Sequence, residues 1–545
     1  MMASVLFFCF IGALAICMAM IPPLMASAGR LHILDLPGER KIHTEPIARV
    51  GGIALAAGVF VAVLMWAPKE KVVVASLVGG LIILFFGAWD DLKGLTYKAK
   101  FMGQSAGAVV VVWGGGVHIA NLPLFSETAL PVWLMIPFTL VALLGVTNAI
   151  NLADGLDGLA GGLSLLSFGG IAYLAYLAED MTVMLLAVSM LGGLLGFLRF
   201  NTYPARLFLG DNGSQFLGFF LGVAAIVLTD VSRGPYSPAL ALLLVGLPLL
   251  DTIGVMGQRL AEGRSPFLAD KNHIHHKLLA AGFFHHEAVL ILYAVQAGMV
   301  GLAYLLRWQS DGMVLTVYAC LAVIVLSLFS PAGRGWIHVN RPAGERSHEV
   351  SAIRRLRTSW WVTELPIRLL GAGVLLFLAL SVFLPSQVPA DFGYPAALLF
   401  GVMVVGLAAF PRARLYLVRF GLYVSSTFVL YLSEQAPLRS TWPIHVPLTV
   451  LFAVLAVLIV IAIRFNRHNQ FQTTPLDYLM VFLALIIPIL PEVRIGETEL
   501  SLLTAKLIIM FFAFELLLHA VSDKLAQLGL VPLWVLMGLG IRAWW

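Results

Sequence analysis

The sequence has little charge. Only 12% of its 545 residues are Asp, Glu, Lys or Arg, whereas 60% are hydrophobic. A soluble domain carries about 25% charged residues, so this composition excludes a soluble globular protein and predicts one that crosses a membrane many times. Cysteine is also scarce. Cys9, Cys17 and Cys320 all lie within apolar runs and form no CxxC pair, so they give no sign of a metal or redox role.

Apolar runs of spanning length, about 17–25 residues, recur along the chain. Eleven lie near residues 4–26, 51–67, 72–89, 105–121, 131–148, 159–178, 182–198, 214–229, 238–256, 287–306 and 312–330. About seven more lie near residues 366–385, 394–410, 415–432, 445–463, 476–490, 501–519 and 529–542. The first run lacks a positively charged start and a clear cleavage site, so we expect it to be retained as a span. The expected fold class is an all-α polytopic membrane protein.

The chain divides at a basic segment. We expect a first membrane domain over 1–330, a basic linker over 331–365, and a multi-span extension over 366–545. Lys and Arg gather in alternate loops, which the positive-inside tendency places in the cytoplasm. Charges in the extension look scattered and predict no catalytic constellation there; they include Glu364, Arg368, Asp477 and Glu515.

Carboxylates stand where the apolar runs end. These are Asp90, Asp91, Asp154, Asp157 and Asp211, and the loop assignment puts all five on the cytoplasmic side. A carboxylate within a membrane span costs roughly 2.5–3.5 kcal/mol on insertion scales. Such a set predicts one shared polar site, suited to a divalent cation and a phosphorylated substrate. Adjacent carboxylates such as Asp90 and Asp91 repel each other, so at least one needs a cation, a lysine or a proton.

The segment NAINLADGLDGLAGG holds a regular ladder of polar side chains. Asn148, Asn151, Asp154 and Asp157 are each three residues apart, a spacing that places neighbours on one face of a helix. Oxygen ligands of this kind suit Mg²⁺ rather than zinc. The alternative is a helix cap and turn, which Asn, Asp and Gly also favour.

Two further segments carry polar groups. FNTYPARLFLGDNGSQ places Asp211 at the start of a span, where acidic groups bind metal and free N–H groups bind phosphate, and it offers the Phe208 ring for a base to stack on. ADKNHIHHKLLAAG carries His273, His275 and His276 among lysines. Phosphate contact, a solvated loop and a zinc site are all open to these histidines. The next pair, His285 and His286, is read as a helix start without a role.

Taken together, four motifs in order resemble the polyprenyl-phosphate N-acetylhexosamine-1-phosphate transferase superfamily, glycosyltransferase family 4. They are DD after a span, NxxNxxDGxDGLA, FxGDxGS and ADKxHxHH, and the resemblance covers roughly residues 1–330. The resemblance implies about ten or eleven helices with a cytoplasmic active site. It also implies that a lipid phosphate attacks the β-phosphorus of a UDP-sugar, releasing UMP and forming a lipid-diphospho-sugar.

Roles follow from the resemblance by motif match. Asn151 and Asp211 match metal positions, for Mg²⁺ or alternatively Mn²⁺. Asp90, Asp91, Asp154 and Asp157 are the candidate catalytic residues. Phe208 matches a position that stacks on uracil, and Lys100, His273, His275 and His276 match phosphate contacts. Asn148, in the same ladder, is assigned to substrate binding as well.

The resemblance also implies the partners: a UDP-N-acetylhexosamine, undecaprenyl phosphate and the lipid bilayer. The HIHHKLLAAG segment resembles that of the GlcNAc-type members of the family, which favours UDP-GlcNAc. No nucleic acid is expected, and a homodimer is one assembly open to the chain. The expected location is a bacterial inner membrane. Two rival functions are an intramembrane aspartyl protease, from the FLGD segment, and a secondary transporter of an anionic substrate. Both place their polar residues within the membrane rather than at one face.

Overall fold

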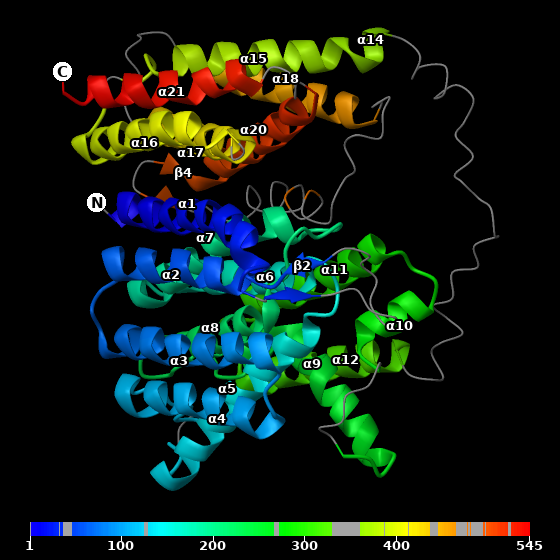
Figure 1. Ribbon diagram of the computed structural model, residues 1–545. Coiled ribbons are helices and arrows are strands. Elements are labelled where there is room, and N and C mark those ends of the chain that lie inside the picture. Colours follow the sequence, from blue (N-terminus) through cyan, green and yellow to red (C-terminus); the bar gives the residue numbers. More distant parts are fainter. Residues whose placement is uncertain are drawn as a thin grey trace. The chain divides into compact units, whose positions relative to one another are not determined.

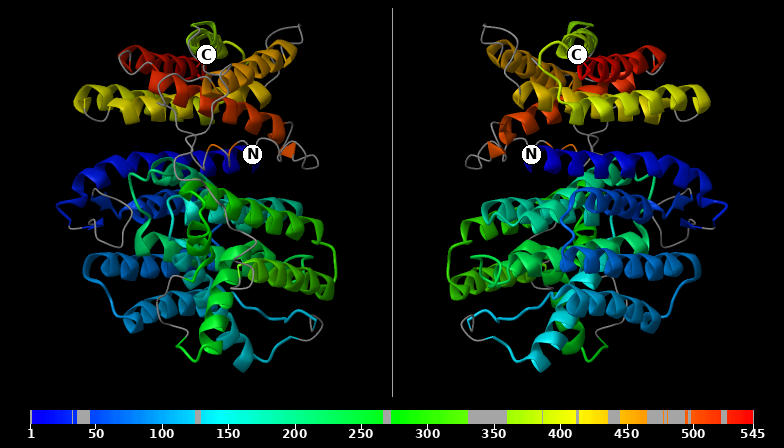
Figure 2. Two further views of the ribbon diagram at one scale, coloured as in Figure 1. Left: turned by 90° about the vertical axis from the view of Figure 1, so that its right-hand side faces the viewer. Right: turned by 90° about the vertical axis from the view of Figure 1, so that its left-hand side faces the viewer.

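A computed structural model describes residues 2–31, 33–35, 46–124, 129–265, 272–329, 360–385, 387–411, 414–435, 445–464, 477, 480, 494–495, 498–520 and 525–544. The chain divides into two compact units, one within residues 1–342 and one within 343–545. Both consist almost entirely of helices (Figures 1 and 2). The basic linker predicted over 331–365 lies mostly outside the described residues, which resume at Trp360.

The helices of the first unit are α1 (Met2–Ala28), α2 (Gly51–Trp66), α3 (Lys71–Lys93), α4 (Tyr97–Val109), α5 (Val132–Ala153), α6 (Leu159–Leu177), α7 (Met181–Asn201), α8 (Gly210–Leu228), α9 (Leu240–Ala261), α10 (Ile274–Ala280), α11 (His285–Leu305) and α12 (Asp311–Leu328). A π-helical turn, η1 (Val110–Gly114), extends α4. Two short antiparallel strands, β1 (Leu34–Asp35) and β2 (Ile47–Ala48), precede α2, with Leu34 opposite Ala48. In Figure 1, α1, α2, α3 and α4 run roughly parallel.

The second unit contains α14 (Trp360–Thr363), α15 (Leu365–Ser381), α16 (Ala390–Ala409), α17 (Arg414–Gln435), α18 (His445–Arg464), α20 (Leu500–Ala520) and α21 (Leu525–Arg542). The strands β3 (Arg494–Ile495) and β4 (Thr498–Glu499) form a short antiparallel pair. The span predicted near 476–490 lies almost wholly outside the described residues.

The helices have the length and composition of membrane spans. Among the described residues, eleven helices are long and apolar enough to cross a membrane, nine in the first unit and two in the second. Four shorter apolar helices, 51–66, 365–381, 447–463 and 528–542, lie where further spans were predicted. The predicted fold class, an all-α polytopic membrane protein, is confirmed. The run near 105–121 is not one straight span, because α4 starts earlier, at Tyr97, and ends in η1.

Helix α8 forms the centre of the first unit. Within its spanning window, 94% of the residues are buried, and it packs against α2, α3 and α5. Close approach to α3 depends on Gly87, where a Cβ would lie 2.4 Å from the Asn212 Cα. The helix begins at Gly210, four residues before the predicted span near 214–229, so Asp211 belongs to its first turn and not to a preceding loop.

Charged side chains inside the second unit pair with one another. Arg419 on α17 lies with its Nε 3.0 Å from the Glu515 Oε1 on α20, and the Tyr423 hydroxyl donates to the same carboxylate. Lys506 and Glu434 form a second buried pair between the same helices. The expectation of scattered charges is therefore wrong for Glu515, and also for Glu364 and Arg368, which pair with each other at 3.1 Å. Unpaired charges in an apolar interior are costly, and these two pairs fix how α17 and α20 align.

Helix α9 is broken in its middle. Gly246 has the non-helical angles φ 53° and ψ −123°, and Pro248 lacks a backbone N–H. Gln296 of α11 reaches into the break: its Oε1 accepts the Leu247 N–H at 2.8 Å, and its Nε2 donates to the Leu244 carbonyl at 3.2 Å. One side chain thus satisfies backbone groups that the break leaves free.

Replacing Gln296 by Leu should destabilise the protein, because backbone groups of α9 would lose their buried partner. The expected loss is roughly 1–3 kcal/mol for each buried group left unpaired. Thermal unfolding of the detergent-solubilised protein measures it. Gln258→Leu is the matched control, since Gln258 lies on α9 beyond the break and its side chain donates to the exposed Glu262 at 2.9 Å. Equal melting temperatures for the two variants would contradict this role of Gln296.

Candidate active site

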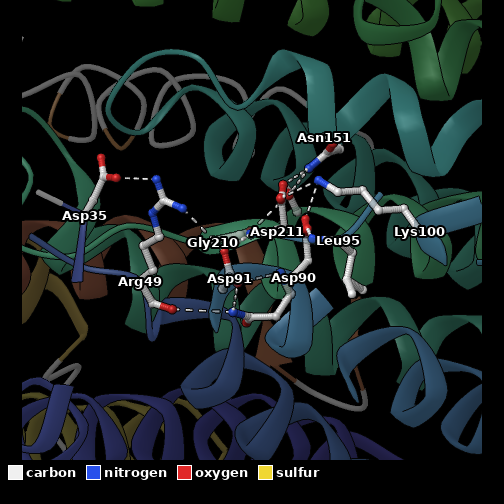
Figure 3. Close-up of polar contacts among 11 residues, drawn as sticks. Asp35, Arg49, Asp90, Asp91, Leu95, Lys100, Asn151, Gly210 and Asp211 are labelled. Carbon is white, nitrogen blue, oxygen red and sulfur yellow. Dashed lines mark hydrogen bonds and ion pairs between the residues drawn. The ribbon is translucent and has the colours of Figure 1, made fainter. Parts of the chain in front are cut away.

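Asp91, near the end of α3, holds the start of α8 (Figure 3). Its Oδ1 accepts the backbone N–H of Asp211 at 3.0 Å, and its Oδ2 accepts that of Asn212 at 3.1 Å. The first N–H groups of a helix lack partners within the helix, and negative charge is favoured beside them. The N-cap residue of α8, Leu209, has no capping side chain. The Asp91 carboxylate therefore caps α8 from a neighbouring helix.

The backbone at Gly210 makes room for this contact. Gly210 has φ +76°, a left-handed conformation that glycine adopts without strain. A Cβ there would lie 2.7 Å from the Asp91 Oδ2. Any side chain at position 210 would therefore displace the Asp91 carboxylate from the end of α8.

Asp90, the other carboxylate of the pair, contacts different groups. Its Oδ1 accepts the Leu95 N–H at 2.6 Å, and its Oδ2 forms an ion pair with Lys100 of α4. The Lys100 Nζ also lies 3.0 Å from the Asp211 Oδ2. The ammonium thus offsets repulsion between carboxylates of two helices. The Asp211 side chain remains 31% exposed, whereas that of Asp91 is 1% exposed.

Amide side chains of α5 position Asp211 and extend the polar cluster. The Asn151 Nδ2 donates to the Asp211 Oδ1 and to the Ser214 Oγ, each at 2.7 Å. One turn earlier, the Asn148 Nδ2 donates to the Gln104 Oε1 of α4 at 2.8 Å. The ends of α3 and α5, the first two turns of α4 and the start of α8 therefore bring their polar groups to one place.

The polar ladder does not continue along one helix, and that prediction was wrong. Helix α5 ends at Ala153, so Asn148 and Asn151 are helical, Asp154 is the C-cap residue, and Asp157 lies in the turn before α6. The cause is local: two Asp-Gly pairs follow Ala153, and Gly158 adopts φ +80°. The alternative of a cap and turn thus describes Asp154 and Asp157 correctly.

The pKa of an aspartate in the turn between α5 and α6 is raised. Burial and the nearby carboxylates of Asp211, Asp91 and Asp157 raise the pKa of Asp154 to about 7. The Asp157 Oδ2 accepts the Ala205 N–H at 3.0 Å. A cation bound beside Asp154 would favour the charged form of the Asp154 carboxyl group. The turn is therefore suited to binding a ligand that brings a cation with it.

Two of the three histidines predicted to bind phosphate are buried. The His273 Nδ1 lies 2.9 Å from the Asp251 Oδ2 of α9. His275, on the first turn of α10, packs against the turn after α5, with its Nε2 2.2 Å from where a Gly155 Cβ would lie. Burial, and then His276 and His273, lower the pKa of His275 to about 3. His275 is therefore neutral near pH 7, and His276 is half-buried beside it.

Phe208 lies directly before α8 and is half-buried. Its backbone N–H donates to the Ala48 carbonyl of β2 at 2.8 Å, and its carbonyl accepts the Gly51 N–H of α2 at 3.0 Å. These bonds fix the Phe208 backbone close to the start of α8. Whether its ring stacks on a base stays a prediction.

Sequence reasoning missed other residues around the site. The His285 Nε2 accepts the Asp157 N–H at 3.1 Å, and its ring stacks on Tyr203 at 4.5 Å between centroids. Arg49 pairs with Asp35 and lies 3.9 Å from Asp91. The cost of a carboxylate in an apolar run, which identified the five aspartates, could also have identified Asp251 in LPLLDTIG.

The donor set at Asp90, Asn151 and Asp211 fits a hard cation. No group of three or more His, Cys, Asp and Glu residues forms a closed metal cage within the described ranges. Mg²⁺ does not need one, since it commonly binds one or two carboxylates and completes its shell with water and phosphate oxygens. The part-exposed Asp211 carboxylate, held by Asn151 and Lys100, has the chemistry of such an open site. Coordination by Asn151 itself requires its amide oxygen, whereas its nitrogen now faces Asp211.

Several known proteins are similar to this chain in sequence. Residues 73–229 match the model of Glycosyl transferase family 4. The chain is 33% identical over 288 residues to the "Probable undecaprenyl-phosphate N-acetylglucosaminyl 1-phosphate transferase" of Bacillus subtilis, covering 52% of this chain and 80% of that protein. It is 30% identical over 295 residues to the "Undecaprenyl-phosphate alpha-N-acetylglucosaminyl 1-phosphate transferase" of Escherichia coli, covering 52% and 78%.

A third relative comes from another bacterial group. The "Decaprenyl-phosphate N-acetylglucosaminephosphotransferase" of Mycobacterium tuberculosis is 32% identical over 302 residues, covering 50% of this chain and 75% of that protein. All three matches extend over about half of this chain and most of each relative. Because it is at least 30% identical to these relatives over three quarters or more of their length, this chain belongs to glycosyl transferase family 4.

Proposed function

We propose that this protein transfers GlcNAc-1-phosphate from UDP-GlcNAc to undecaprenyl phosphate and releases UMP, at the cytoplasmic face of a bacterial inner membrane. The observation that carries the proposal is the meeting of Asp90, Asp211 and Lys100 where α3 ends and where α4 and α8 begin. The names of the relatives support the sugar and the class of acceptor.

The reaction joins two anions. An oxygen of the acceptor phosphate forms a bond to the β-phosphorus of the donor. The bond from that phosphorus to the oxygen that bridges to the α-phosphate breaks, and UMP leaves with that oxygen and its electron pair. Because both reactants are anionic, the site must offset their repulsion and hold them in line. Lys100, beside two carboxylates, is placed to contribute a positive charge to this task.

A magnesium ion is proposed at Asp211, with Mn²⁺ as an alternative. When bound, it would neutralise charge on the diphosphate and on the departing UMP. Asp211 would hold it, and Asn151 would support it once its amide turned its oxygen toward the ion. A metal at this position would compete with the Lys100 ammonium for Asp211, which leaves Lys100 available to a phosphate.

The two adjacent aspartates take different roles in this proposal. Both carboxylate oxygens of Asp91 accept N–H groups at the start of α8, and the Asp91 side chain is almost fully buried. Asp91 therefore positions Asp211. Asp90 faces Lys100 and the part-exposed Asp211, so it is the member assigned to the acceptor side. An acceptor phosphate is already largely ionised near neutral pH, so Asp90 has no need to act as a strong base.

The direct test is transfer of radiolabel from UDP-GlcNAc to undecaprenyl phosphate, with UMP release. We expect a lipid-extractable product that requires Mg²⁺ or Mn²⁺. Asp211→Asn should lower kcat by at least ~100-fold, because the carboxylate at the proposed metal is lost. Asp230→Asn, in the loop after α8, is the matched control and should keep normal activity.

Other outcomes would identify what is wrong. Absence of lipid product with every UDP-HexNAc would overturn the transferase proposal and favour a transporter. Product formed only with a different UDP-HexNAc would correct the sugar. Full activity in the presence of excess chelator would show that the reaction does not need the proposed metal ion.

Asp91→Asn and Asp90→Asn should fail in different ways. Asp91→Asn places an amide nitrogen among N–H donors, so it should lower stability by about 1.5–3 kcal/mol, the range for hydrogen bonds to charged groups. Asp90→Asn should lower kcat by ~100-fold or more with a smaller effect on stability. Melting temperature and kcat, measured on the same preparations, separate the two. A stable but inactive Asp91→Asn protein would reverse the assignment.

A further inference from the structure

The carboxylate of Asp251 lies within a membrane-spanning helix and outside the cluster of five aspartates. It occupies α9, beyond the break at Gly246, and is 8% exposed. A carboxylate in a span is costly and usually has a functional partner. The partners of Asp251 are two consecutive residues of the histidine segment, a part of the site that sequence reasoning could not link to α9.

Both oxygens of Asp251 are used. Its Oδ2 lies 2.9 Å from the His273 Nδ1, and its Oδ1 accepts the Ile274 N–H at 3.0 Å. The second bond caps α10 from outside, since its N-cap residue, His273, makes no side-chain cap of its own. The first bond places a proton on the His273 Nδ1 and leaves the Nε2 as the nitrogen available to a ligand.

The same contact sets the position of the rest of the segment. His273 and His275 stack with their rings nearly parallel, at 8° and 5.9 Å between centroids. His275 in turn packs against Gly155, in the turn that carries Asp154 and Asp157. Asp251 is thus the first element in a sequence of contacts from α9 through α10 to that turn.

We propose that Asp251 is a positioning residue for donor binding: its carboxylate orients the His273 ring and fixes the start of α10 so that the histidine segment contacts the diphosphate of the UDP-sugar. This role rests on the proposed function. An ordinary cap could be supplied by Asn as well as by Asp. To hold the His273 ring with its proton on Nδ1, a hydrogen-bond acceptor must face the Nδ1. One oxygen of the Asp251 carboxylate is that acceptor, while the other oxygen caps α10.

The test compares Asp251→Asn with Asp251→Ala in the full-length, detergent-solubilised protein. In the Asn variant, the amide oxygen can still accept the Ile274 N–H. The amide NH₂ group then faces the His273 Nδ1, and it cannot accept a proton from that nitrogen. We expect Asp251→Asn to raise the KM for UDP-GlcNAc by ~10-fold or more, with the KM for undecaprenyl phosphate unchanged. Asp251→Ala should do the same and also lower the melting temperature. In a His273→Ala background, Asp251→Asn should raise the donor KM no further.

Asp180→Asn is the matched control. Asp180 caps α7 by accepting the Thr182 and Val183 N–H groups, outside the site, and its replacement should leave both KM values unchanged. A wild-type donor KM in Asp251→Asn would overturn the proposal and leave Asp251 as a cap alone. Equal increases in both KM values, or a further increase in the His273→Ala background, would overturn it too. An inactive wild-type protein with every UDP-HexNAc would instead overturn the proposed function, and the donor role of Asp251 with it.

Discussion

The contact between the Asp91 carboxylate and the first N–H groups of α8 is the interaction on which the site depends. It joins the end of one membrane helix to the start of the most buried one, and it needs Gly210 to leave space. Because the contact fixes the first turn of α8, it also fixes Asp211, the next residue of the site. A charge at the edge of the apolar interior is thereby compensated by helix-end dipoles rather than by water.

The remaining polar groups follow the same physical rule. Three of the carboxylates have partners from another element: Asp90 has Lys100, Asp211 has Asn151 and Lys100, and Asp251, within α9, has the start of α10. Such groups are costly when unpaired, so pairing decides which elements meet. The open part of this network is around Asp211 and Lys100, where side chains keep about a third of their exposure. That is where charged substrates can reach it.

The second unit uses charge differently. Arg419 with Glu515, and Lys506 with Glu434, are buried ion pairs that join α17 and α20. These contacts explain how charged residues exist in an apolar bundle, and they give the unit a defined alignment of its two central helices. Asp211 differs from these residues, because its carboxylate pairs with Lys100 and is still partly accessible to solvent.

Composition and apolar patterning were enough to assign the membrane class and most of the spans, and they drew attention to the carboxylates at the ends of those spans. An apolar composition and apolar runs of spanning length directly indicate helices that cross a lipid bilayer. A carboxylate in such a run stands out because placing it in the membrane is unfavourable in free energy. Tertiary structure decided what spacing could not. The Asn148 to Asp157 ladder broke at Ala153, since a three-residue spacing fits a helix end and a turn as well as a helix. The different contacts of Asp90 and Asp91, and the link from Asp251 to His273, 22 residues along the chain, depend on which helix ends pack together. That choice is made by close contacts between helices, such as Gly87 against Asn212, and no local pattern encodes it.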